Sequence, residues 1–122
     1  MNDLLQRIVN AMIRQEGMAH DYANPGNLRG APWLSAPLIQ NGFWKPVSRA
    51  VGVAGLAHVV ALHIAQGNSL TDFIGGHPGV YAGFAPGADK NDPVSYIAHI
   101  AEWAEIPSAT LPLWNFIEQV PT

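Results

Sequence analysis

The sequence predicts a mainly α fold, with helices packed around a buried central helix and a small irregular or short-β segment at about residues 18–46. Two observations carry this prediction. Residues 48–66 are apolar on nearly every helical face, which is typical of a helix in the middle of a fold. Residues 18–46 are dense in Asn, Gly and Pro and have no helical period, which indicates turns.

The composition limits the class of protein. The 122 residues fit a single domain spanning 1–122, and 48% hydrophobic against 12% charged residues can form a real core. The net charge of −3 argues against a nucleic-acid partner and against electrostatic capture by anionic membranes or wall polymers. No cysteine is present, which excludes disulfides and thiolate metal sites, and we expect no cofactor.

The first predicted helix runs from Asp3, a capping residue, to about Gly17, which suits the position that ends a helix. Within the irregular segment, Asn41-Gly42 is typical of a hairpin turn. The remaining predicted helices are 48–66, a short helix after the capping pair Ser69 and Asp72, one that begins at Asp92-Pro93 and continues to about 104, and a last one from Pro112 to Val120.

Glu16 is the candidate catalytic residue. On a helical wheel it projects into the middle of the apolar arc of the first helix, close to Leu5, Val9 and Met12. Loss of hydration there and the negative end of the helix dipole are both expected to raise its pKa, as a glycosidase general acid requires. Periodicity alone leaves another interpretation open, in which Glu16 points into solvent or pairs with an arginine.

The surrounding sequence favours the catalytic interpretation. Arg14-Gln15-Glu16-Gly17, followed by Tyr22 and by Asn24-Pro25-Gly26-Asn27-Leu28-Arg29, resembles the lysozyme-like superfamily. The resemblance is closest to small phage-encoded muramidases and lytic transglycosylases with an "EG…NPGN(I/L)R" signature. Later blocks extend it to about residues 5–106, through Phe84-Ala85-Pro86 and the run from Asp89 to Tyr96.

This resemblance implies a lysozyme-like α+β domain that cleaves the β-1,4 bond between N-acetylmuramic acid and N-acetylglucosamine in peptidoglycan, with Glu16 as the catalytic acid. The loop from Asn24 to Arg29 would form one wall of the sugar groove, where amide groups suit N-acetyl and hydroxyl groups. A purely structural turn stays open for this loop. The residues expected to bind substrate are Tyr22, Asn24, Asn27, Arg29, Tyr81, Asn91 and Tyr96.

The sequence departs from the family pattern at one place, and two of the expected site residues also have a structural explanation. Phe84 stands where the family has a tyrosine, although Tyr81 lies three residues upstream. Asn91 matches the family, but helix capping by Asp92 explains much of that block. Tyr96 is expected either to face the groove or to be a buried tyrosine with one hydrogen bond.

A second catalytic carboxylate is not evident. Pro25 stands nine residues after Glu16, where one phage-lysozyme pattern has a carboxylate, and Asp21, Asp89 and Asp92 are not compelling. One carboxylate suits a lytic transglycosylase, in which the muramic C6 hydroxyl replaces water and leaves a 1,6-anhydro product. It equally suits a lysozyme with a loosely placed partner, so the choice stays open.

The histidines and tryptophans are weaker candidates. His58 and His63 are five residues apart and fall on different faces of one helix, so no metal site is expected. Trp33 or Trp44 is the best candidate for a sugar-stacking platform because both lie in the loop segment.

The N-terminus reads as an amphipathic helix and not as a secretory signal, and histidines and an arginine interrupt the longest apolar run, so we expect no stable membrane insertion. An enzyme of this kind would be made in the cytoplasm and reach the periplasm or cell wall as an endolysin released by a holin, or by delivery with a phage virion or secretion assembly. The alternative is a catalytically silent lysozyme-like module that binds glycan or serves such an assembly structurally.

Overall fold

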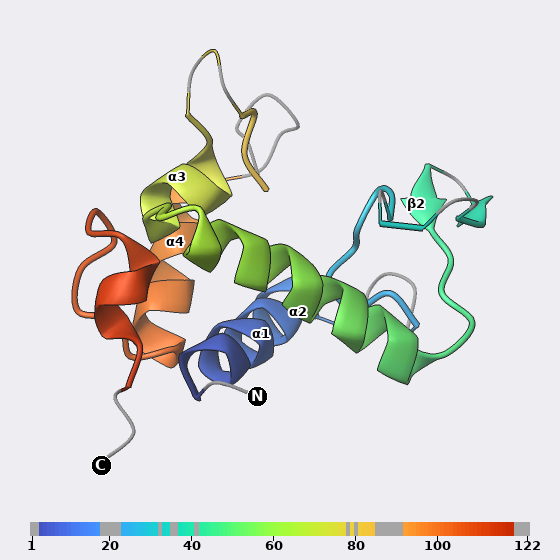
Figure 1. The fold of residues 1–122 in the computed structure, drawn as a ribbon, viewed down its shortest axis with the longest axis horizontal. Coiled ribbons are helices and arrows are strands. Elements are labelled where there is room, and N and C mark those ends of the chain that lie inside the picture. Colours follow the sequence, from blue (N-terminus) through green and yellow to red (C-terminus); the bar gives the residue numbers. More distant parts are fainter. Residues whose placement is uncertain are drawn as a thin grey trace.

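Helices make up most of the computed structural model (Figure 1). The structure describes residues 3–17, 23–31, 33–34, 37–40, 42–77, 79, 81–84 and 92–118. Its elements in chain order are α1 (Asp3–Glu16), β1 (Ile39–Gln40), β2 (Phe43–Trp44), α2 (Arg49–Ala65), α3 (Leu70–Gly75), α4 (Pro93–Trp103) and the 3₁₀ turn η2 (Leu113–Phe116). The prediction of a mainly α fold with a short-β segment within 18–46 is confirmed.

Helix α1 is amphipathic, and its apolar arc faces the protein interior. Leu4, Ile8, Val9 and Met12 on this arc are completely buried, and the helix packs against both α2 and α4. Gly17 ends the helix as predicted: its φ of +71° lies in the left-handed region, and its N–H donates to the Ile13 carbonyl. This abrupt end places Glu16 on the last turn, where the chain leaves the helix.

The two strands pair as a hairpin at one end of the molecule (Figure 1). Gln40 pairs with Phe43 and Ile39 with Trp44, so two residues join the strands, and Gly42 has a φ of +82°. Asn41, the other residue of the predicted hairpin turn, lies outside the described residues. The Trp44 N–H donates to the Leu28 carbonyl. This hydrogen bond attaches the loop at residues 23–31 to the hairpin.

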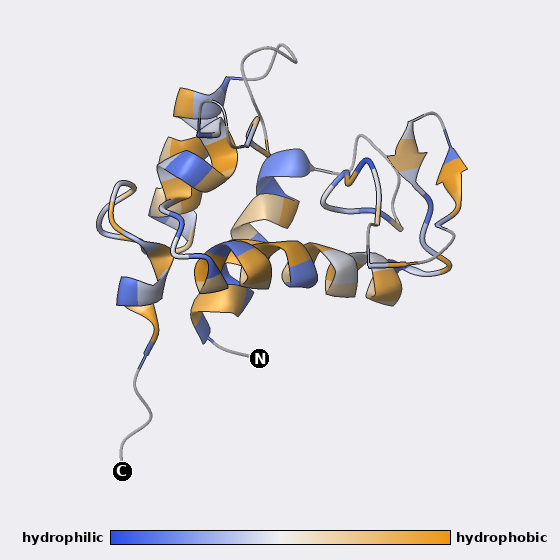
Figure 2. Cartoon of the chain, turned by 45° about the horizontal axis from the view of Figure 1, so that its top comes forward, coloured by the Kyte–Doolittle hydropathy of each residue, from blue (hydrophilic) through white to orange (hydrophobic). Residues whose placement is uncertain are grey.

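Helix α2 lies on one side of the core and is not enclosed by the other helices, so the predicted buried central helix is not confirmed. Its small residues Gly52 and Gly55, together with Leu56 and Val60, are buried, whereas Leu62 on the opposite side is 45% exposed. Figure 2 shows orange along much of α2, interrupted by blue and pale turns. An apolar composition predicted burial on all sides, but this small domain covers only one face of the helix.

The starts of three helices follow from their capping residues. The hydroxyl of Ser48 accepts from the Val51 N–H at the start of α2, and that of Ser69 accepts from the Asp72 N–H at the start of α3. The Asp92 carboxylate accepts from the Ser95 N–H, with Pro93 in the first turn of α4. These caps confirm the predicted starts of all three helices.

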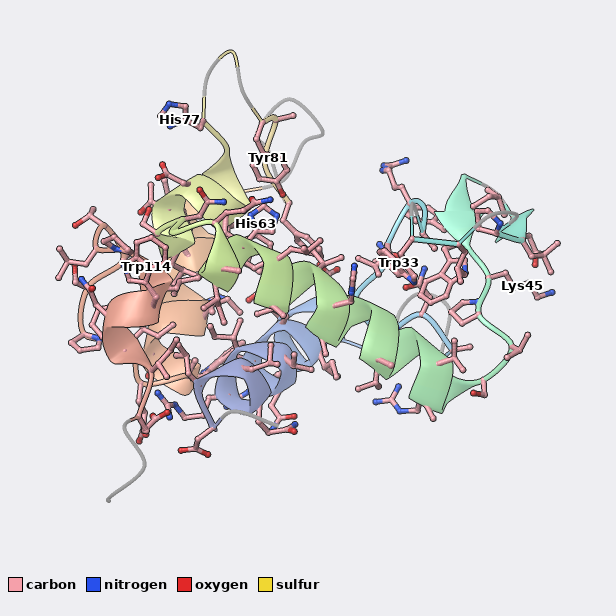
Figure 3. The ribbon with its side chains drawn as sticks, in the orientation of Figure 1. Trp33, Lys45, His63, His77, Tyr81 and Trp114 are labelled. Atoms are coloured by element: carbon pink, nitrogen blue, oxygen red, sulfur yellow. The ribbon has the colours of Figure 1, made fainter. Side chains whose placement is uncertain are left out.

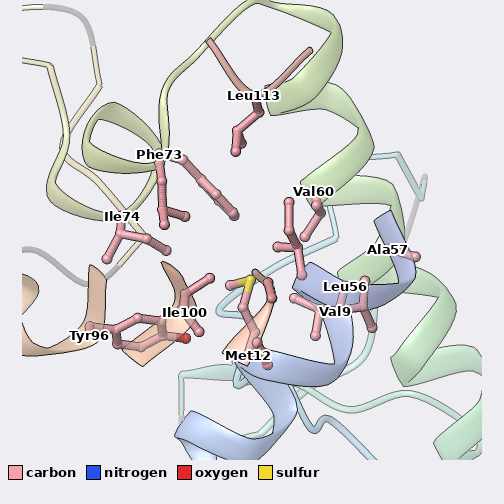
Figure 4. Close-up of a cluster of buried hydrophobic side chains, with 14 of the residues drawn as sticks. Val9, Met12, Leu56, Ala57, Val60, Phe73, Ile74, Tyr96, Ile100 and Leu113 are labelled. Carbon is pink, nitrogen blue, oxygen red and sulfur yellow. The ribbon is translucent and has the colours of Figure 1, made fainter. Parts of the chain in front are cut away.

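The core lies where α1, α2, α3 and α4 meet (Figure 4). Met12 of α1, Phe73 of α3, Ile100 of α4 and Leu113 of η2 are all completely buried there. The predicted last helix, Pro112 to Val120, is wrong in its described part: only the four residues of η2 are helical, because the Ile117 backbone is already extended. Among the described residues, no helix has both the length and the apolar character needed to cross a membrane.

Candidate active site

The candidate acid lies at the C-terminal end of α1, against the first turns of α4. The Glu16 side chain is partly buried, and its Oε1 accepts a hydrogen bond of 2.9 Å from the Tyr96 hydroxyl. Eighty positions separate these residues in the chain, and the packing of α1 on α4 brings them together. The Glu16 side chain is therefore directed at the protein and does not point past the last turn into solvent.

Tyr96 is 6% exposed, and its ring contacts Phe84 at 6.2 Å between centroids. Burial, then the charge of Glu16 and the hydrogen bond to it, raise the pKa of Tyr96 well above the ordinary tyrosine value of 10. The hydroxyl therefore keeps its proton near neutral pH and donates a hydrogen bond to the Glu16 carboxylate. Tyr96 is thus a buried tyrosine with one hydrogen bond, and its partner is the candidate acid.

A second side-chain pair joins α1 to α4 beside Glu16. The Gln15 Oε1 lies 2.6 Å from the His99 Nδ1, and since an amide oxygen only accepts, His99 carries a proton on Nδ1. The His99 ring stacks on Trp103 with an angle of 16° between the planes, and the Arg14 guanidinium lies 4.0 Å from the centre of the same tryptophan. Contacts of Arg14, Gln15 and Glu16 therefore join the last turn of α1 to α4.

The Asn24 side chain holds the 23–31 loop in shape. It is 1% exposed; its Nδ2 donates to the carbonyls of Leu28 and Trp44 at 2.9 and 2.8 Å, and its Oδ1 accepts from the Leu28 N–H at 3.0 Å. These polar atoms bind the protein's own backbone. This corrects the expectation that Asn24 offers its amide to a sugar, and the structural-turn interpretation holds at this position.

Asn27 and Arg29 lie on the accessible side of the same loop. Asn27 has a φ of +54°, and its N–H donates to the Asn24 carbonyl, which closes the turn. Arg29 is exposed, and its guanidinium lies 4.8 Å from the centre of the Phe43 ring on β2. Asn27 is partly exposed and Arg29 is exposed.

Tyr81 belongs to a different cluster. It forms an isolated antiparallel bridge with His77, and its ring lies 4.9 Å from that of His63 near the end of α2. Burial raises the pKa of Tyr81 to about 12. Figure 3 shows His63 and Tyr81 at one end of α2 and Trp33 near its other end. The structure therefore brings Tyr96 to Glu16 and places Tyr81 elsewhere.

Several other expected residues fall outside the part of the chain that the structure describes. Tyr22 and Asn91 lie outside the described residues, as do Asp21 and Asp89 among the carboxylates considered as a second acid. Asp92 is described and caps α4 through its Oδ1, which accounts for this carboxylate structurally.

Trp44 is 3% exposed and packs edge-on against Trp33 at 5.6 Å, which corrects the expectation that it could serve as a stacking platform. Trp33 is only partly buried, with His58 tilted against its ring at 4.6 Å, so it keeps some accessible surface. Within the part of the chain that the structure describes, no group of three or more His, Asp or Glu side chains is arranged to hold a metal ion.

The sequence patterns missed the Gln15–His99 pair and the contact of Asn68 with His63. The Gln15–His99 pair depends on the alignment of α1 with α4, and residue spacing along the chain does not reveal that alignment. The cluster of His63 and Tyr81 also contains Asn68, whose Nδ2 donates to His63 Nδ1 at 2.8 Å. The only sequence signal for that contact is an asparagine just after the end of an apolar helix.

Comparison of the chain with protein-family models, with curated proteins and with solved structures finds no match. The function therefore has to be argued from the chain's own residues, and above all from the Glu16 carboxylate that Tyr96 holds at the junction of α1 and α4.

Proposed function

We propose that this chain is a peptidoglycan-cleaving glycosidase of lysozyme-like fold, forming one domain, with Glu16 as its general acid. The observation that carries the proposal is the partly buried Glu16 carboxylate, whose Oε1 accepts the Tyr96 hydroxyl at 2.9 Å. A glycosidase needs a carboxyl group held at a fixed position and partly shielded from water. The order of the Glu16-Gly17 pair and the loop after it supports the substrate class.

In the first step Glu16 gives its proton to the oxygen between N-acetylmuramic acid and N-acetylglucosamine. The bond from the muramic C1 to that oxygen breaks, and N-acetylglucosamine leaves with a free 4-hydroxyl. The Tyr96 hydroxyl holds the carboxyl group through Oε1. Tyr96 acts as a positioning residue, since its hydroxyl orients the carboxyl group and stabilises the charge left after transfer.

In the second step the Glu16 carboxylate takes a proton from the acceptor that attacks C1. A water molecule as acceptor gives a reducing muramic end, as in a lysozyme, and the muramic C6 hydroxyl gives a 1,6-anhydro end, as in a lytic transglycosylase. Pro25 occupies one expected position of a second carboxylate, and Asp92 serves as a helix cap. Both observations agree with a mechanism that uses Glu16 twice.

The proposal gives Asn27 and Arg29 the role of sugar contacts on one wall of the groove, because both lie on the accessible side of the 23–31 loop. Peptidoglycan strands are the proposed partner. The enzyme would reach the wall after holin release, as a phage endolysin does, or by delivery with a virion or secretion assembly. Its negative net charge favours delivery by an assembly over free diffusion to an anionic wall.

The proposal is tested by the loss of turbidity of permeabilised Gram-negative cells treated with wild type or with Glu16→Gln. The substitution keeps the size of the side chain and removes the transferable proton, so we expect lysis to fall at least about a hundredfold. Glu102→Gln changes an exposed glutamate on α4 and serves as the matched control with wild-type activity. Equal lysis by wild type and Glu16→Gln would contradict the catalytic role of Glu16. No lysis by either protein would favour the catalytically silent glycan-binding module.

A further inference from the structure

A cavity of about 610 Å³ opens at the far end of α2, where the helix meets α3, His77 and Tyr81. Its volume is in the range of small-molecule sites. The last turns of α2 contribute His63 and Gln66, and Asn68, Asp72 and Tyr81 complete most of the polar lining. Figure 3 shows His63 and Tyr81 facing one another there.

The cavity is separate from the proposed acid. A row of aromatic rings runs between the two sites, from Tyr96 to Phe84 at 6.2 Å, to Phe73 at 5.5 Å and to His63 at 4.4 Å. Tyr96 binds Glu16 at one end of this row, and His63 lines the cavity at the other. A ligand in the cavity therefore does not need Glu16.

The hydrogen bonds of His63 fix which of its nitrogens carries a proton. The Asn68 Nδ2 donates to His63 Nδ1 at 2.8 Å and also lies 3.3 Å from the Gln66 Oε1, so this amide nitrogen faces two acceptors. The His63 proton must then be on Nε2. Burial lowers the pKa of His63, and its ring stacks on Phe73 at an angle of 24°, so the cavity holds a neutral, oriented imidazole donor.

The remaining lining groups favour an uncharged ligand with several hydroxyls. No lysine or arginine is among the described lining residues, and Asp72 is the one carboxylate, so an anionic ligand would meet no permanent counter-charge. Carboxylate and amide oxygens accept from hydroxyl groups, and Gln66 and His63 Nε2 donate to them. The Tyr81 ring, half-buried beside His63, offers an apolar face of the kind on which a sugar ring packs.

We propose that this cavity is a second ligand site that binds an uncharged saccharide unit, with Tyr81 as the stacking surface and His63, Gln66 and Asp72 as its hydrogen-bonding groups. The site extends the proposed function and is independent of Glu16. It would hold glycan at one end of the molecule while cleavage occurs at the junction of α1 and α4.

The test titrates the full-length Glu16→Gln variant with tri-N-acetylchitotriose and follows the side-chain NMR signals of His63 and Asn68. We expect both signals to shift on saturation, and Gln66→Ala in the same background to weaken the affinity about fivefold. Tyr81→Ala should weaken it about tenfold. Gln6→Ala, on the outer side of α1, is the matched control and should leave the affinity unchanged.

The proposal is overturned if the His63 and Asn68 signals stay in place at saturating sugar, or if both cavity variants bind with the control's affinity. It is also overturned if inorganic phosphate shifts these signals and the sugar does not. Gln66 is an exposed residue, so its variant keeps the test decisive even if Tyr81→Ala is unstable. Lytic activity retained in Glu16→Gln would defeat the proposed acid and leave this site standing, and the reverse result would defeat only this site.

Discussion

At the scale of single residues, Glu16 and Asn24 show what sequence patterns can and cannot predict. The helical wheel predicted that Glu16 lies toward the apolar side of its helix, and the side chain is partly buried. Its partner Tyr96 is eighty positions away, and only the packing of α1 on α4 selects it. For Asn24 the sequence left two roles open, and burial in three hydrogen bonds decides for the structural one.

The role of the Tyr96 hydroxyl is tested with Tyr96→Phe, which keeps the ring packed against Phe84 and removes the donor to Glu16. Without this hydrogen bond the ionised carboxylate loses stabilisation, so we expect the lytic rate to fall about tenfold. The protonated form of Glu16 should also persist to higher pH, which shifts the pH profile of the rate to higher pH.

The matched control for this variant is Ser95→Ala, which removes a hydroxyl from the preceding position of α4. It should keep both the rate and the pH profile of wild type. A lower rate in Tyr96→Phe without any change in its pH profile would indicate a purely structural role for the hydroxyl.

Asn24→Ala is expected to lower the free energy of unfolding by about 3 kcal/mol, because it leaves the buried Leu28 N–H and Trp44 carbonyl without their partner. Urea denaturation measures this change. Asn115→Ala, an exposed asparagine in η2, should change stability by less than about 0.5 kcal/mol. If the two variants are equally stable, the loop does not depend on Asn24.

At the scale of elements, the sequence was most successful where local chemistry decides. Ser48, Ser69 and Asp92 cap the helices that they were expected to begin, and Gly17 ends α1. Predictions from the sequence were wrong where the burial of a helix depends on segments far away in the chain. Apolar residues in α2 suggested burial on all sides, and those near residue 112 suggested a full helix where only η2 forms.

The small residues of α2 have a specific packing role. A Cβ on Gly52 would lie 1.6 Å from the Ala23 carbonyl oxygen, and one on Gly55 would lie 2.4 Å from the Trp44 ring. These glycines let the 23–31 loop and the hairpin approach the helix closely, which fixes the loop in position.

Gly52→Ala is therefore expected to destabilise the protein by about 2 kcal/mol, although alanine favours a helix over glycine by about 1 kcal/mol. Thermal denaturation followed by circular dichroism measures the effect. Gly75→Ala is the matched control in α3, where the added methyl would lie at an ordinary 3.8 Å from Ile97, so it should be neutral or stabilising. A Gly52→Ala protein as stable as wild type would show that the loop is not held against α2.

At the scale of the whole molecule, different segments of the chain form the two ends of the long axis. The hairpin and the 23–31 loop lie at one end and α3 lies at the other (Figure 1). The cavity lies where α2 meets α3. The sequence predicted the elements at both ends but not the cavity. Asn68 and Tyr81 contact His63 only in the folded protein, so residue spacing alone does not predict these contacts.

His63 also makes the stability of the fold depend on pH. Burial lowers its pKa below the ordinary 6.5, so the unfolded chain binds a proton more readily than the folded one between these two values. The contribution of His63 to the free energy of unfolding is complete above pH 6.5 and is lost as the pH falls through the lowered pKa. The free energy of unfolding should therefore decrease as the pH falls below 6.5.

This dependence is measured by urea denaturation of wild type and His63→Gln at pH values from about 7.5 down to 5. The variant is expected to lose part of the slope, because the buried imidazole is gone. Asn115→Ala changes an exposed side chain that does not titrate and should keep the wild-type slope. Equal slopes in all three proteins would mean that His63 does not couple protonation to folding.

The most direct test of the central claim is mass spectrometry of the fragments released from purified sacculi by wild type and by Glu16→Gln. The account predicts that wild type releases fragments cut between N-acetylmuramic acid and N-acetylglucosamine, with reducing or 1,6-anhydro muramic ends, and that Glu16→Gln releases almost none. Fragments cut in the stem peptides, or equal glycan release by the two proteins, would contradict it.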